Sequence, residues 1–182
     1  MRDKTTADRR FAAHGPAAGS GGEEMPVLFW TVLLFIHMLF AVTLLGAVTH
    51  QAVSVCWPNR HGAKSFVSGF RGVNAARYTN AIIVLFLCTA VLGSIIYPNY
   101  RINVRTVLHQ FHHYIPEGSF ELKEHAVAIG AALLPAYWYF WRGADADANR
   151  AARNGVTILL AVIVWWAFMV GHVINNIRGF GA

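Results

Sequence analysis

Four apolar stretches of roughly membrane-crossing length dominate this 182-residue chain. They occupy residues 27–48, 81–97, 126–141 and 156–174. A helix needs about 20 mainly apolar residues to cross a bilayer, so two stretches are long enough and two are near the lower limit. Only helices or closed barrels pair their backbone groups in lipid, and continuous apolar runs favour helices. The sequence therefore predicts an all-α integral membrane protein built as a four-helix bundle.

Composition supports a lipid environment. Hydrophobic residues make up 55% of the chain and charged residues 13%, whereas soluble domains are about 25% charged. The formal net charge is +6, but the basic residues are spread over loops and tails, as topology signals and contacts with anionic lipid are. No nucleic-acid motif accompanies them. We therefore expect the lipid bilayer as a partner, and no nucleic acid.

Three regions are expected along the chain. Residues 1–25 are polar and rich in glycine, alanine and charge, which predicts a disordered tail. Residues 26–178 form the transmembrane domain, and residues 179–182 form a short C-terminal tail. The chain therefore has one folded domain.

Proline and aromatic residues predict the helix limits. The first helix is expected to start after Pro26 and to stop before Trp57, because proline suits the first turn of a helix. The second is expected to stop at Tyr97, next to a proline, and residues 101–115 to form a short interfacial helix. A turn at 116–119 would precede a third helix that begins near Phe120. The fourth would end near residue 177, after a polar hairpin at 143–154.

These helices define two faces of the membrane domain. The first face holds the N-terminus, loop 98–121 and the C-terminus, and the second face holds loops 57–79 and 143–154. Lysine and arginine near the membrane are slightly more frequent at the second face, so the positive-inside rule makes that face cytoplasmic. We expect a bacterial inner-membrane protein with the N-terminus and loop 98–121 outside the cytoplasm.

Three histidines in or beside the apolar stretches are the main functional candidates. His37 lies well inside the first stretch, about 15 Å from its start. His125 begins the third stretch and His172 lies near the end of the fourth, so antiparallel helices place both rings at similar depth. An ionisable ring in hydrocarbon is costly and usually has a partner or a function. These positions indicate a membrane-bound redox or metal site.

Small residues on the same helices would leave room for a flat cofactor. They are Ala128, Gly130, Ala132 and Ala136 on the third helix, Ala161, Ala167 and Gly171 on the fourth, and Ala41 and Gly46 on the first. Over residues 27–177 this pattern resembles the four-helix membrane b-type cytochromes of quinone-linked redox complexes. The resemblance implies one haem b whose iron is held by His125 and His172, with His37 and His172 as the alternative pair. It also implies an electron-transfer subunit, itself without catalytic residues, between quinol and a partner redox subunit.

Other interpretations of the same residues remain open. His125 lies near Glu121 and Glu124, so a local polar cluster or a metal site at the first face is an alternative. Small residues at four-residue spacing also serve plain helix packing. The chain would then be an accessory or anchoring subunit without a cofactor. A quinone site is possible near His172, where Asn175 and Asn176 meet the hydrocarbon edge.

Overall fold

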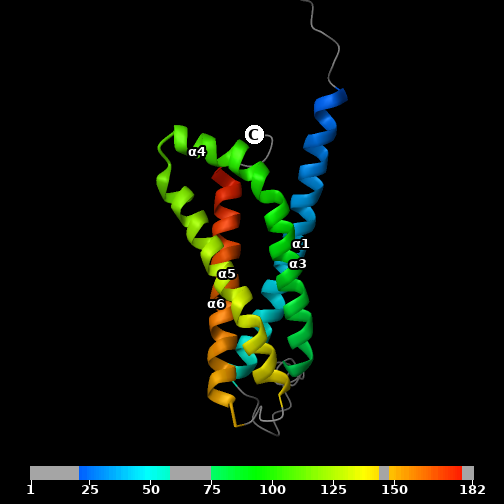
Figure 1. The fold of residues 1–182 in the computed structure, drawn as a ribbon, viewed down its shortest axis with the longest axis vertical. Coiled ribbons are helices and arrows are strands. Elements are labelled where there is room, and N and C mark those ends of the chain that lie inside the picture. Colours follow the sequence, from blue (N-terminus) through cyan, green and yellow to red (C-terminus); the bar gives the residue numbers. More distant parts are fainter. Residues whose placement is uncertain (1–20, 58–74, 144–147, 178–182) are drawn as a thin grey trace, which may run out of the picture.

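The computed structural model describes residues 21–57, 75–143 and 148–177 (Figure 1). Within these ranges the regular secondary structure is helical throughout, which confirms the all-α prediction. The longer helices are α1 (Gly21–Cys56), α3 (Tyr78–Tyr100), α5 (Tyr114–Arg142) and α6 (Arg150–Ile177). Shorter elements are η1 (Ala75–Arg77), the π-helical turn η2 (Arg101–Arg105) and α4 (Thr106–Gln110).

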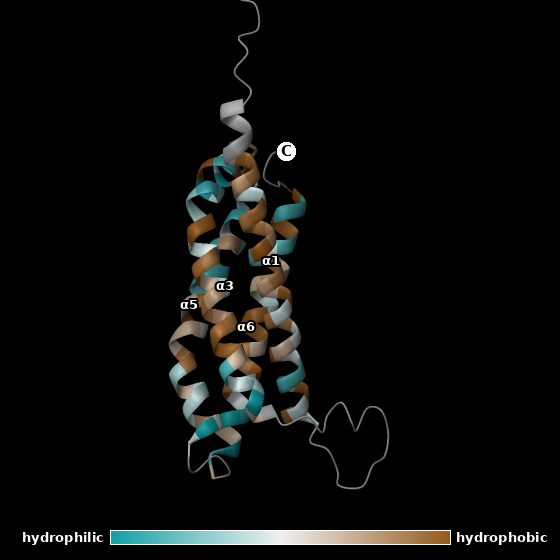
Figure 2. Cartoon of the chain, turned by 90° about the vertical axis from the view of Figure 1, so that its right-hand side faces the viewer, coloured by the Kyte–Doolittle hydropathy of each residue, from teal (hydrophilic) through white to brown (hydrophobic). Residues whose placement is uncertain are grey.

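Three helical segments are long and apolar enough to cross a membrane. They are Val27–Cys56, Tyr78–Gln110 and Arg150–Ile177 among the described residues. Figure 2 shows that hydrophobic residues prevail in the central part of the helices and that hydrophilic residues gather towards the ends. These segments indicate a membrane protein. α5 is not among them, because Glu117, Glu121, Lys123 and Glu124 charge its first turns, so the fourth span stays a prediction.

The predicted helix limits hold at some ends and fail at others. α1 stops at Cys56 and α6 at Ile177, as expected. α1 begins at Gly21, five residues before Pro26. The remaining residues of the expected disordered tail, 1–20, and those of the C-terminal tail lie outside the described residues.

The second helix does not stop at Tyr97. α3 passes through Pro98 to Tyr100 and continues into η2 and α4. Proline and π-helical turns are recognised causes of sharp changes in helix direction. Here they allow one helical path to turn from the long helices to the first face, where α4 crosses towards α5 (Figure 1).

The predicted turn at 116–119 is also wrong. α5 begins at Tyr114, so Pro116 lies in its first turn, where the missing N–H would have no helical acceptor. The chain reverses earlier instead, at His112, whose φ is +58°. The N–H of His113 then donates to the carbonyl of Leu108 over 2.8 Å.

Packing places α1 and α5 at opposite corners of the helix arrangement. α1 packs on α3 and α6, and α5 packs on the same two helices. The N-terminal end of α1, α4, the start of α5 and the end of α6 share one end of the molecule (Figure 1). This arrangement agrees with the predicted grouping of segments at the first face. Which face is cytoplasmic remains a prediction.

Two separate apolar cores hold the helices together. The larger core joins all four long helices towards the second face and includes Val48, Ile82, Leu134 and Leu160. The smaller core lies at the first face, where Tyr100, Val104 and Leu108 pack with Val170 and Ile174 of α6. Between the two cores the buried apolar side chains include Ile96 of α3, which belongs to neither core.

Candidate functional site

The two histidines of the preferred pair lie on the outside of the described helices. His125 on α5 and His172 on α6 are both exposed. The His172 ring stacks on Phe168 of its own helix, with ring centroids 6.2 Å apart. No hydrogen bond, ion pair or ring contact joins the two histidines within the described residues. The chain by itself therefore does not enclose a group between them, and their assignment as ligands stays a prediction.

The polar residues beside His172 are also turned outward. Asn175 and Asn176 are exposed. The side-chain amide of Asn176 donates to the backbone carbonyl of His172 over 2.9 Å, which is a contact within one helix. The expected quinone site at this position has no further support from the arrangement of these side chains.

His37 is the predicted site residue that the structure places inside. The ring is half-buried on α1, and its Nδ1 atom is buried and makes no hydrogen bond of good geometry within the described residues, although the backbone of Thr89 on α3 lies close enough to act on the ring. It faces Gly93 of α3 so closely that a Cβ atom added to Gly93 would lie 3.2 Å from His37 Cε1. A buried polar atom without a partner is uncommon and requires an explanation. Glycine here provides the room in which the ring lies.

Gly130 shows what the same residue type does in the larger core. A Cβ atom there would lie 2.8 Å from Phe86 Cζ and 3.2 Å from the Ile163 side chain. Gly130 therefore serves close helix packing, and Phe86 fills the interior at that level. By contrast, Gly46 and Gly171 have nothing within 4 Å of an added Cβ atom.

The His37 ring lies midway between the two cores. Gly93 follows Phe86 of the larger core by seven residues and precedes Tyr100 of the smaller core by seven. At the helical rise, each separation is about 10 Å along α3. The level of Gly93 is therefore distinct from both packed regions.

α5 contributes a lysine beside the smaller core, on which Phe120 packs. Lys123 is half-buried, and its Nζ atom lies 3.6 Å from the centroid of the Phe120 ring. It forms no ion pair or hydrogen bond within the described residues. The contact with the ring is a cation–π interaction, and the carboxylate of the adjacent Glu124 also acts on the charge of the amine.

An aromatic stack continues from Lys123 towards the first face. The rings of Phe120 and Tyr100 are 3.8 Å apart and 14° from parallel, and Tyr97 lies 6.2 Å from Phe120. Tyr100 occupies one face of Phe120 and Lys123 the other. The Tyr100 hydroxyl is buried without a hydrogen-bond partner in the described part of the chain. We call His37, Gly93, Lys123, Phe120 and Tyr100 the candidate site.

Sequence reasoning missed Lys123 because it lies among charged residues that suggest a solvated helix start. A periodic signal was nevertheless present. Core-facing positions on α5 recur every three or four residues, at Phe120, Lys123, Val127, Gly130, Leu134, Tyr137 and Trp141. Residues two apart lie about 200° apart around a helix, so Lys123 faces inward where His125 faces out.

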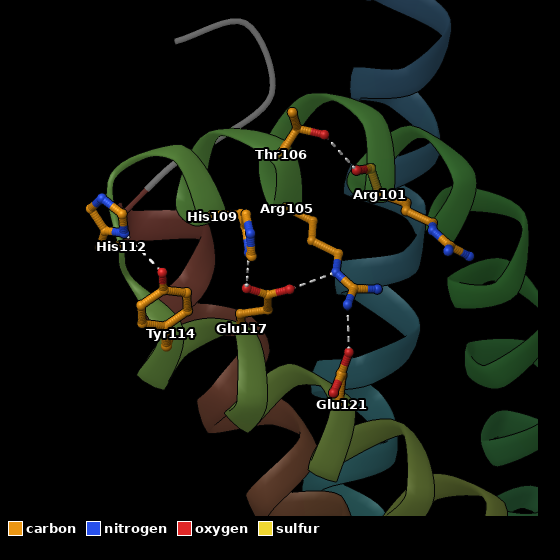
Figure 3. Close-up of polar contacts among 8 residues, drawn as sticks. All are labelled: Arg101, Arg105, Thr106, His109, His112, Tyr114, Glu117 and Glu121. Atoms are coloured by element: carbon orange, nitrogen blue, oxygen red, sulfur yellow. Dashed lines mark hydrogen bonds and ion pairs between the residues drawn. The ribbon is translucent and has the colours of Figure 1, made fainter.

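A separate ionic cluster ties α4 and η2 to α5 at the first face (Figure 3). Arg105 Nε donates to Glu117 over 2.8 Å, and another guanidinium nitrogen donates to Glu121 over 2.7 Å. The His109 ring lies 3.3 Å from the second oxygen of Glu117. The hydrogen bond from Arg105, and then that from His109, lower the pKa of Glu117. These carboxylates therefore act first as partners of Arg105 rather than as a patch open to a metal ion.

Comparison with known proteins assigns no family. No protein-family model, no curated protein and no solved structure matches this chain. The resemblance to membrane b-type cytochromes therefore rests on the helix and histidine pattern alone. The functional argument must come from the candidate site.

Proposed function

We propose that the chain is a four-helix membrane bundle in which α5 is the fourth span. Its support is the packing of α5 against α3 and α6 and the burial of its Gly130, Leu134 and Tyr137 face. The charged turns of α5 gather at the first face, where the ionic cluster lies. Charges at a span end reach the headgroup region and need not enter the hydrocarbon.

We further propose that this membrane subunit passes electrons between quinol and a partner redox protein, with one haem b held by His37. The observation that carries this proposal is the buried, unpartnered Nδ1 atom of His37 opposite Gly93. An imidazole is a common axial ligand of haem iron. A ligating role would give this nitrogen its missing partner.

His37 is a better-buried candidate ligand than either histidine of the predicted pair. His125 and His172 are exposed, whereas His37 faces the level between the two cores. Lower in the molecule, Phe86 occupies the space beside Gly130. A bound haem would supply the one-electron chemistry, while the protein supplies ligation and burial, which set the reduction potential.

The test is an optical spectrum of the purified full-length protein, oxidised and dithionite-reduced. We expect a Soret band that H37A abolishes and that H50A retains, since His50 lies at the second face against Tyr78. A Soret band kept by H37A but lost in both H125A and H172A would return the ligand assignment to the predicted pair. No Soret band in the wild-type protein after haem supplementation would refute the redox proposal.

A cofactor-free accessory or anchoring subunit is the second candidate. The observation that favours it is a set of exposed apolar side chains at the first face, where Phe111 is 69% and Ile115 83% exposed. Such residues suit a contact with a partner subunit. The wild-type protein would then carry no haem and would copurify with a partner. F111S and I115S would release that partner.

The proposed location is a bacterial inner membrane with the first face outside the cytoplasm. Cys56 is exposed at the second face and Cys88 is half-buried in α3. In C88S protein, an impermeant maleimide should label Cys56 only after the cells are permeabilised. Labelling of Cys56 in intact cells would reverse the orientation.

A further inference from the structure

A groove lies between the start of α5 and the second half of α6. Its volume is about 220 Å³. α5 contributes Ile115, Pro116 and Ser119 to its lining, and α6 contributes five residues between Trp166 and Ile174. α5 crosses α6 at an angle, so the two helices diverge towards the first face (Figure 1). The groove occupies the space that this divergence leaves.

The smaller core forms the inner wall of the groove. Val170 and Ile174 line the groove and also belong to that core, where they pack with Tyr100. Met169 and Val173 line the groove from the outer side of α6, where both are exposed. The groove is therefore closed towards the interior and open towards the surroundings of α6.

The position of the groove along α6 places it in hydrocarbon. α6 is one of the segments long and apolar enough to cross a membrane. Trp166 lies eleven residues before the end of α6 at Ile177, and Ile174 lies three residues before it. At the helical rise these separations are about 16 Å and about 5 Å. Half of the hydrocarbon core is about 15 Å thick, so the groove falls within the half nearer the first face.

The lining and the size of the groove fit a hydrocarbon chain. Only Ser119 and Trp166 among the lining residues carry a side-chain oxygen or nitrogen atom, so water would lack partners there. An apolar cavity of about 150 Å³ stays dry and binds benzene, so this groove has room for a segment of a chain. A helix about 10 Å across would occupy on the order of 1,000 Å³ over the roughly 12 Å from Trp166 to Ile174. The groove can therefore hold a chain but not a partner helix.

We infer that the groove binds one acyl chain of a phospholipid from the bilayer leaflet at the first face. The chain lies along α6 between Trp166 and Ile174, and the headgroup lies beyond Ile174, at the level of the exposed Asn175. The amide of Asn175 can donate hydrogen bonds to phosphate or ester oxygens of the lipid. This inference does not depend on haem binding.

The experiment compares two adjacent tryptophans of α6. Trp166 lines the groove and Trp165 does not, although the two are similarly exposed, at 40% and 44%. Full-length protein in detergent is titrated with phosphatidylcholine that is brominated in its acyl chains, because bromine quenches tryptophan fluorescence on contact. We expect quenching that saturates near one lipid per protein in the wild type and in W165F. W166F should lose this saturable phase.

Filling the groove tests the same site without removal of a tryptophan. S119F places a ring in the groove, so the saturable phase should disappear although Trp166 remains. S94F is the matched control, because Ser94 is exposed on α3 and does not line the groove. Its titration should match that of the wild type. Elution and circular dichroism check that both variants fold, and the comparison of W165F with W166F decides the matter if S119F does not.

Four results would overturn the inference. Quenching that never saturates shows that lipid only surrounds the helices without a specific site. A saturable phase that persists in W166F and in folded S119F places the bound lipid elsewhere. A saturable phase with a long-chain isoprenoid quinone, and none with the phospholipid, assigns the groove to quinone. Saturable quenching that appears only after a copurifying protein is removed assigns the groove to a side chain of that protein.

Discussion

The two ends of this molecule differ in the hydrogen bonds that their buried aromatic side chains make. Towards the second face, the Tyr137 hydroxyl donates to Gln51, and the Trp141 indole donates to Thr157 over 3.0 Å. Towards the first face, the Tyr100 hydroxyl and His37 Nδ1 are buried without partners among the described residues. An unpaired buried polar group destabilises a fold, and both halves contain such groups, since Thr79 Oγ1 and Asn154 Oδ1 towards the second face also lack a hydrogen-bond partner among the described residues. The two halves therefore differ in their aromatic side chains: Tyr137 and Trp141 hydrogen-bond to other helices, whereas Tyr100 does not among the described residues.

The largest expected effect is overpacking of the second half. G130L forces a side chain into Phe86 and Ile163, so we expect a loss near the upper end of ~1–3 kcal/mol in stability. G171L is the matched control, because nothing lies within 4 Å of a Cβ atom at Gly171. Thermal unfolding in detergent measures both. Equal melting temperatures would show that the second half is not the better-packed region.

Removal of one hydroxyl from each half compares them directly. Y137F leaves Gln51 without the hydrogen bond that Tyr137 donates, and we expect a loss of about 1–3 kcal/mol. Y100F removes a hydroxyl that has no partner, so its stability should equal or exceed that of the wild type. Chemical denaturation of both variants gives the two values. A destabilised Y100F would indicate that the first half contains a hydrogen bond beyond those described.

Substitution of Gly93 tests whether the first half is specialised for a ligand. In G93A the new methyl group lies 3.2 Å from the His37 ring, so the ring must move by a few tenths of an ångström. We expect a small change in melting temperature but a clear decrease in haem content on reconstitution, because the ring is displaced from its position. A loss of stability as large as that of G130L would indicate that Gly93 serves packing alone.

The smallest effect concerns the ionic cluster and its dependence on pH. The pKa of Glu117 is lowered in the folded protein, so its ion pair stabilises the attachment of α4 above the unfolded pKa of about 4.3. That contribution is lost as the pH falls through the lower folded pKa. Protection factors of the α4 amides, which correct each exchange rate for its intrinsic dependence on pH, should therefore decrease at acid pH in the wild type.

E117Q provides the control for this pH dependence. Glutamine carries no charge at any pH, so the protection factors in α4 should be lower than in the wild type at neutral pH and nearly independent of acidification. The amides of the larger core should be unaffected in both proteins. An acid-induced decrease in α4 protection that persists in E117Q would assign the pH dependence to another group.

Whether a helix end or a membrane span could be predicted from the sequence depends on whether local residues or tertiary contacts determine it. The ends of α1 at Cys56 and α6 at Ile177 were predictable, because apolar runs stop there. The start of α5 was not, since Pro116 is compatible with both a turn and a first helical turn. Composition indicates a membrane protein, but α5 falls short of a span by apolar length because its early turns are charged.

The candidate site was predictable only in part. His37 was identified because its depth along one apolar stretch is readable without a fold. Lys123 depends on which stripe of α5 faces inward, and its contact with Phe120 depends on how α3 aligns with α5. The ion pair between Glu117 and Arg105 was not predictable, because it forms only when the chain reverses at His112. No local sequence motif indicates that reversal.

A continuous helical path from Gly93 to Gln110 connects α4 to the interior of the molecule, so a movement of α4 would be transmitted to interior residues. The path is uninterrupted, since α3, η2 and α4 follow one another directly in the chain. Arg105 also links this path to α5 through its ion pairs. A displacement of α4 would therefore act on both α3 and α5, the helices that carry the stacked rings of Tyr100 and Phe120. A protein that binds at the first face would thus displace the Tyr100–Phe120 pair. The surroundings of His37 would change as a result, although the bound protein makes no contact with the ring.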